Sequence, residues 1–163
     1  MADLFDVRGG NLNLSASALS FSGADTLYST TGTQTFVIGG RVYTTAADTN
    51  VEVPDTDATT GAAFVALATL KQCLFVFGWL ASGEMGVSQG PIVDTADVVD
   101  GSAALVFPSI PDTLVPFAYA SAKYVGSGTW TFGTSNWDAT TVTFGTVVEV
   151  MLLPTRPLTA ASA

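Results

Sequence analysis

Histidine is absent from the 163-residue sequence, and cysteine occurs only once. Without histidine the chain lacks the commonest general base and the commonest neutral metal ligand, so a Ser-His or Cys-His nucleophile cannot be built from one chain. Cys73 has no second cysteine with which to form an internal disulfide. Because it opens the apolar run 73–77, we expect it to be a buried small hydrophobic residue.

Charge is also scarce, and most of it is negative. Charged residues make up 12% of the chain, whereas an average soluble domain has about a quarter. The net charge is −9. The basic residues stand singly along the sequence: Arg8, Arg41, Lys71, Lys123 and Arg156. Since phosphate binding needs clustered Lys and Arg, the sequence argues against nucleic acid as a direct partner.

Hydrophobic residues and threonine take the place of the missing charge. They amount to 48% of the chain and 23 residues respectively, and the mean hydropathy is +0.44. The cores of protein interfaces are depleted of charge in the same way, which predicts that other subunits cover much of the surface. The alternative is a monomer with an unusually uncharged surface.

No membrane association is expected. Residues 62–80 are apolar, but Lys71 and Gln72 lie at their centre, where a charge costs about 2.5–3.5 kcal/mol on insertion. Aromatic and β-branched residues from Leu74 to Trp79 favour a buried strand instead. The acidic segment 1–6 has no apolar core of a signal peptide.

The pattern of the first thirty residues differs from that of the rest. Residues 11–18 alternate between polar and apolar, which predicts a strand with one buried face. The alternation changes phase at Leu19 and Phe21, so the buried face is expected to change sides there, through either a bulge or an arm that crosses from one neighbouring subunit to another. We therefore predict an extended N-terminal arm over residues 1–30 and a single β domain over 31–163.

Short strands follow one another through the β domain. Gly39 and Gly40 form a hairpin signal between two of them. The predicted strands are 35–38, 41–44, 51–53, 74–80, 85–89, 129–132 and the strand-forming stretch 141–153. In that last stretch the apolar even-numbered residues from Val142 to Leu152 are expected to share one face. Periodicity does not decide whether residues 62–70 form a helix or a loop and strand. The expected fold is all-β, an antiparallel sandwich or a barrel-like domain.

No set of residues converges on a catalytic, metal or cofactor site. Asp94, Asp97 and Asp100 are regularly spaced, but they lack the alternating ligands and turn glycine of a calcium loop, and a solvated acidic loop is expected. Nothing in the sequence suggests the opposed carboxylates of a glycosidase. Trp130 is expected in the core, while Trp137 could be buried or could stack on a ligand.

Three segments carry a resemblance to a known family. They are residues 39–43, residues 107–120, and residues 130–140 together with the ending 153–157. Their pattern of prolines, glycines and aromatics resembles small proteins encoded among the virion structural genes of tailed bacteriophages. The resemblance spans about residues 33–157. Independently of it, Pro108, Pro111 and Pro116 predict a stiff connection over 107–116.

The resemblance implies a decoration or cement protein, a β-rich trimer on the outside of the phage head, with the major capsid protein as partner. It brings no catalytic residues. The side chains expected to contact a partner are Leu12, Leu14, Leu19, Phe21, Phe107, Ile110 and Trp137. The alternative is a tail or fibre component that binds a host surface glycan.

Overall fold

The computed structural model describes residues 10–22, 26–136 and 140–154, which form an almost all-β fold. Its elements are β1 (Leu12–Asn13), β2 (Ser20–Ser22), β3 (Leu27–Ser29), β4 (Gln34–Ile38), β5 (Arg41–Thr45), β6 (Val51–Glu52), β7 (Leu67–Ala68), β8 (Lys71–Trp79), β9 (Met85–Gln89), β10 (Val93–Asp94), α1 (Thr95–Asp100), β11 (Val115–Tyr124), β12 (Thr129–Trp130), β13 (Val142–Phe144) and β14 (Val148–Glu149).

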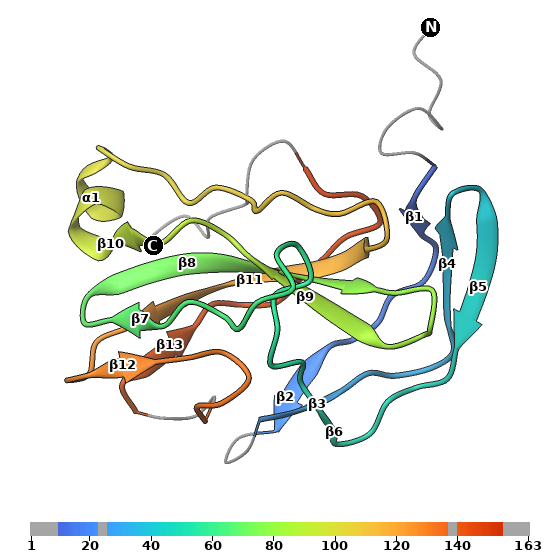
Figure 1. Ribbon diagram of the computed structural model, residues 1–163, viewed down its shortest axis with the longest axis horizontal. Helices are drawn as coiled ribbons and strands as arrows, with labels where there is room; N and C mark the ends of the chain where they lie inside the picture. The colour runs from blue at the N-terminus through green and yellow to red at the C-terminus, as the bar shows by residue number, and fades with distance from the viewer. Residues whose placement is uncertain (1–9, 23–25, 137–139, 155–163) are drawn as a thin grey trace, which may run out of the picture.

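The long antiparallel pair β8 and β11 forms the centre of the molecule (Figure 1). β9 and β10 flank β8, and β13 and β14 flank β11. Eight of the nine residues of β8 are buried, because both faces of the sheet are covered. Phe75 and Phe77 point into the main core, whereas Leu74 and Val76 point into a second, smaller cluster on the other face.

A three-stranded sheet, in the order β1-β4-β5, packs against one end of this central sheet and stands at the right of Figure 1. Phe36 of β4 joins the two, since its ring stacks on Trp79 at 6.1 Å and on Tyr43 at 5.7 Å. A second small sheet, β2-β3-β6, brings Phe21 to 5.4 Å from Phe77. The prediction of an all-β, antiparallel sandwich is confirmed.

Several local predictions are also confirmed. Gly39 and Gly40 connect β4 to β5 with φ angles of +55° and +78°, the left-handed pair that a two-residue hairpin turn requires. Cys73 is fully buried, and Trp130 is only 2% exposed. Residues 62–70, which periodicity left undecided, contain β7 and no helix.

The described part of the predicted arm is extended, but it lies on its own domain. Leu19 and Tyr28 belong to the same core cluster as Phe75 and Trp79. No gap in the packing therefore coincides with the boundary predicted at residue 30. Residues 1–9 lie outside the described residues.

The predicted change of buried face at Leu19 does not occur. Asn11, Asn13, Ser17 and Leu19 are all buried, so the odd-numbered side keeps facing inward. What changes at residue 19 is the chemistry of that side, from polar to apolar. The prediction was wrong because buried polar side chains are stable when they are hydrogen-bonded, and hydropathy alone does not register this.

Three smaller predictions need correction. Pro116 lies inside β11, where the register with β8 shifts between Pro116 and Ala118, and a bulge of this kind accommodates a proline in a sheet. The acidic series 94–100 forms the end of β10 and α1 instead of a loop. At the end of the last predicted strand, Leu153 is buried and Leu152 is exposed, the reverse of the expected alternation.

Candidate functional site

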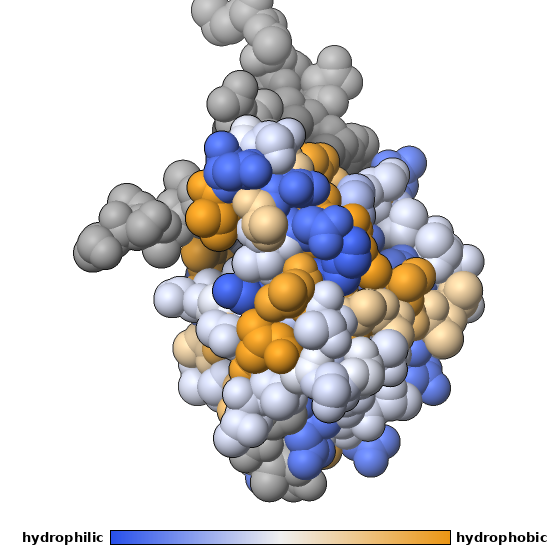
Figure 2. Space-filling model, turned by 90° about the vertical axis from the view of Figure 1, so that its left-hand side faces the viewer, coloured by the Kyte–Doolittle hydropathy of each residue, from blue (hydrophilic) through white to orange (hydrophobic). Residues whose placement is uncertain are grey.

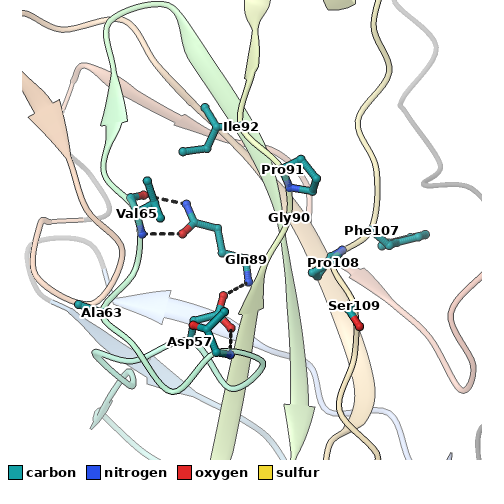
Figure 3. A pocket seen from close by; sticks show the side chains of 11 residues that line it. Asp57, Ala63, Val65, Gln89, Gly90, Pro91, Ile92, Phe107, Pro108 and Ser109 are labelled. Atoms are coloured by element: carbon teal, nitrogen blue, oxygen red, sulfur yellow. Dashed lines mark hydrogen bonds between the residues drawn. The ribbon is translucent and has the colours of Figure 1, made fainter.

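A cleft of about 450 Å³ is the first candidate site (Figure 3). It lies between the loop 57–65, the end of β9 with the residues that follow, and the segment 107–109. It is lined by Asp57, Thr60, Ala63, Val65, Gln89, Gly90, Pro91, Ile92, Phe107, Pro108 and Ser109. Most of this lining is apolar, and Asp57 is its one titratable side chain.

The polar groups at the base of the cleft are already engaged. One carboxylate oxygen of Asp57 accepts the N–H groups of Thr59 at 2.7 Å and Thr60 at 3.1 Å, and the other accepts the N–H of Gln89 at 2.9 Å. The Gln89 amide bonds both main-chain groups of Val65, each at 2.8 Å (Figure 3). These bonds hold the loop 57–65 against β9, and they leave Asp57 poorly placed to act as a base.

The opposite wall of the cleft is tied to the same loop. The Thr59 hydroxyl lies 2.6 Å from the Ser109 carbonyl and 2.9 Å from the Ser88 hydroxyl. Phe107 turns its ring away from Gln89 and meets Tyr119 edge-on, with ring centroids 5.0 Å apart (Figure 3). The cleft is therefore a braced, mostly apolar hollow, suited to an apolar side chain of a partner.

The outer face of the sheet β1-β4-β5 is a second candidate surface. Leu12 is paired with Val37, and Val37 is paired with Val42, so these three side chains form a row across all three strands. Directly opposed residues of antiparallel strands share a face. Val42 is 66% exposed, and none of the three belongs to either core cluster. Leu14, on the same side of its strand, is 44% exposed. We call Leu12, Leu14, Val37 and Val42 the outer apolar face.

Polar side chains on the inner side of residues 11–17 form hydrogen bonds that keep Leu12 and Leu14 on the outer side. Asn11 donates to the Asp112 carbonyl at 2.6 Å and accepts the Gly39 N–H at 2.9 Å. Asn13 donates to the carbonyls of Ser15 at 2.7 Å and Val150 at 3.3 Å. Since these amides fasten the segment to three other parts of the chain, Leu12 and Leu14 have no room to turn inward.

Further along the same inner side, the polar side chains form hydrogen bonds with Gln34. Its side-chain oxygen accepts the hydroxyls of Ser15 at 3.2 Å and Ser17 at 3.0 Å, and its amide donates to the Thr31 carbonyl at 2.6 Å. Gln34 is fully buried. A buried amide with its donors and acceptors paired stabilises one register of the strand over its one-residue slip.

A shallow hollow of about 190 Å³ lies beside the outer apolar face. It is lined by Asn13, Leu14, Ser15, Ala16, Glu149, Val150 and Met151. Met151 is 59% exposed and its carbonyl accepts the Asn13 N–H at 3.3 Å. Apolar surface therefore continues from Leu14 across to the chain that follows β14.

The residues predicted to contact a partner lie in different parts of the molecule: some are on the outer apolar face, some pack in or against the two cores, and one is not described. Leu12 and Leu14 lie on the outer apolar face. Leu19 is buried in the main core, Phe21 is half-buried against it, and Phe107 and Ile110 are half-buried against the second cluster. Trp137 lies outside the described residues. The structure thus brings Leu12 and Leu14 together on one surface and places the next four within or against the cores.

Val37 and Val42 were not among the predicted contact residues, although the sequence holds the signal for them. The Gly39-Gly40 turn sets the register of the hairpin and so places Val37 opposite Val42. Their link to Leu12 depends on the pairing of β1 with β4, which joins segments about 25 residues apart and has no local signature.

Apolar residues are also exposed on another side of the molecule. Figure 2 shows small orange groups of apolar residues among white, weakly polar ones and blue, hydrophilic ones on the side that carries α1. Within the described residues there is one ion pair, Lys71 with Asp94 at 2.7 Å, and it is too exposed to add much stability. No three acidic, cysteine or histidine side chains of the described chain gather as metal ligands would. None of its helices is long and apolar enough to cross a membrane.

Comparison with models of known protein families, with curated proteins and with solved structures found no match.

Proposed function

We propose that this chain is a structural protein of a bacteriophage virion, a decoration or cement protein that binds the outside of the head and stabilises contacts between major capsid subunits. The observation that carries the proposal is the outer apolar face. Four aliphatic side chains on the three strands of one sheet face outward, and two of them belong to a segment whose polar side chains are buried. The stability of the isolated domain does not require this arrangement.

Three further features support a binding role over a catalytic one. The cleft beside Asp57 has its carboxylate and amide bonded internally. The surface is poor in charge, as the centres of protein interfaces are. The family resemblance of residues 33–157 implies a capsid shell as the partner.

Copy number in purified particles tests the location. A decoration protein approaches the abundance of the major capsid protein, so stained-gel densitometry of intact virions should give similar molar amounts of the two. An amount lower by an order of magnitude or more contradicts the proposal and favours the tail or fibre component that binds a glycan.

A pair of lysine variants tests the surface. Leu14→Lys places a charge on the outer apolar face, and we expect it to weaken rebinding to stripped capsids by about tenfold or more, because the charge must be desolvated. Val99→Lys is the control, since Val99 is 82% exposed on α1. Equal rebinding of the two variants, both folded, would exclude this face as the contact.

A further inference from the structure

β5 is the open edge of the three-stranded sheet. Within the described residues it pairs with β4 and with no other strand, and it forms the outer right-hand boundary of the sheet in Figure 1. Its five pairs with β4 run without a register shift. Natural edge strands are usually blunted by proline, bulges or inward charges, and β5 has only Arg41 at its beginning.

The hydrogen bonds of Thr35 show which groups of β5 face this edge. Its N–H donates to the Ser15 hydroxyl at 2.8 Å and its carbonyl accepts the Leu14 N–H at 2.9 Å, so both point toward β1. In an antiparallel ladder both main-chain groups of a residue point to one side, and the side alternates along the strand. Thr44, opposite Thr35, therefore directs its N–H and carbonyl away from β4, and so does Val42.

We propose that a second copy of this chain adds to this edge, with the two β5 strands antiparallel about a two-fold axis beside Tyr43. Val42 of each copy then lies opposite Thr44 of the other, and each of these pairs exchanges both of its main-chain hydrogen bonds. Tyr43 lies opposite its own equivalent. The pairing needs no rearrangement of β4, whose bonds use the other residues of β5.

The charges around β5 favour a second copy over an unrelated strand. In this register Arg41 of one copy lies opposite Thr45 of the other. The β8–β9 turn adjoins Thr45, since a Cβ on Gly83 would lie 3.0 Å from the Thr45 hydroxyl. The next residue, Glu84, is exposed. Arg41 thus approaches Glu84 of the second copy, which offsets part of the repulsion between two chains of net charge −9.

Pairing at β5 would also join the outer apolar faces of the two copies into one. In this register the row Leu12–Val37–Val42 of one copy meets Thr44 of the other copy, and Thr44 leads through Thr35 to Leu14 on the same face. A short strand pair buries less than the roughly 1,200 Å² of a stable interface, so the dimer is weak and depends on concentration. This dimer does not depend on the proposed capsid role, because the open edge of β5 is present in the free protein in solution.

The mass of the full chain in solution tests the pairing. Sedimentation velocity from about 10 µM to about 1 mM should show the mass rise from 16.7 kDa toward twice that value. A constant monomer mass overturns the proposal, and so does a rise to three times the monomer mass, which is the trimer that the family resemblance implies.

Matched substitutions at Thr44 test the site. Thr44→Pro removes an N–H that faces the open edge and none that bonds β4, so we expect a folded protein that stays monomeric over the whole range. Thr44→Val keeps the N–H and should dimerise like the wild type. Dimerisation of a folded Thr44→Pro variant contradicts the proposal.

Two measurements on β5 hold even if the proline variant fails to fold. In the wild type, hydrogen exchange at the amides of Val42 and Thr44 should slow as concentration rises, whereas exchange elsewhere in β5 should not change. Arg41→Glu should weaken the dimer, and the double variant Arg41→Glu with Glu84→Lys should restore it. Concentration-independent exchange at both amides overturns the proposal, as does a failure of the double variant to recover.

Discussion

At the scale of single residues, Asn13 shows how polarity can be buried while apolar neighbours stay outside. Its side chain is 1% exposed, and its amide nitrogen bonds two carbonyls, while its side-chain oxygen has no partner among the residues that the structure describes. An unpaired buried acceptor costs stability, so the two donated bonds must outweigh that cost for this register to persist.

Replacing Asn13 tests this arrangement. Asn13→Leu leaves the Ser15 and Val150 carbonyls without their donor, and we expect a loss of about 1–3 kcal/mol in the free energy of unfolding. The adjacent Leu14→Asn, on the exposed side, should change it by no more than about 0.5 kcal/mol. Urea unfolding of both variants checks the pair. The reverse order of stabilities would show that Leu14, not Asn13, is the buried residue.

Cys73 provides a pH-dependent prediction at the same scale. Burial raises the pKa of its thiol to about 12, and the Gln89 amide at 3.6 Å lowers it slightly. The unfolded thiol ionises near pH 8.5. The folded state therefore keeps this stabilisation below about pH 8.5 and loses it as the pH rises toward 12.

The measurement is urea unfolding at pH 7 and pH 10. The wild type should lose about 2 kcal/mol more than Cys73→Ala between the two, since the alanine variant lacks the ionising group. Tyr28, whose pKa burial also raises above its usual value, is present in both proteins and cancels in the comparison. Equal losses would contradict a buried neutral thiol.

At the scale of elements, the turn 131–135 is fixed by a close approach between two loops. Gly133 has a φ of +79°, and a Cβ there would lie 2.6 Å from the Pro54 carbonyl oxygen. Gly40 has nearly the same φ, +78°, but no described residue lies within 4 Å of its Cβ position. The two glycines therefore separate the cost of the backbone conformation from the cost of a steric clash.

Alanine at each position measures these costs. Gly40→Ala should lose about 1–2 kcal/mol, the cost of the left-handed conformation. Gly133→Ala should lose a further 1–3 kcal/mol, roughly, because the Pro54 backbone cannot move aside easily. Thermal unfolding of the two variants gives the difference. Equal losses would mean that the two loops do not touch.

The elements also show what could be predicted from the sequence. The hairpins at Gly39-Gly40 and at residues 81–84 carry their own turn signals, so their strands were predicted nearly correctly. The pairing of β1 with β4 and the packing of residues 107–110 on the second cluster have no local signal, because they join distant segments. The outer apolar face combines both kinds of contact, and therefore only Leu12 and Leu14 of its four residues were found.

At the scale of the whole molecule, residues 10–30 share a core with the rest of the chain. Deletion of residues 1–30 removes Leu19, Phe21 and Tyr28 from that core, together with three strands. We expect this protein not to fold, as judged by amide dispersion and circular dichroism. Deletion of residues 1–9 removes none of these contacts and should leave the fold intact. A folded, cooperative product of the longer deletion would show that the arm is dispensable.

The side-chain bonds that fasten the first strands also set the order in which the chain can fold. Asn13 bonds Val150, 137 residues later, and the Leu19 N–H bonds the Glu149 carboxylate, 130 residues later. These contacts close among the largest loops in the molecule, so they are expected to form late and to slow folding. During synthesis these two bonds must wait until residue 150 has left the ribosome, so in that interval the segment 11–22 is held only by its contacts with earlier residues, and the unfinished core is exposed to aggregation.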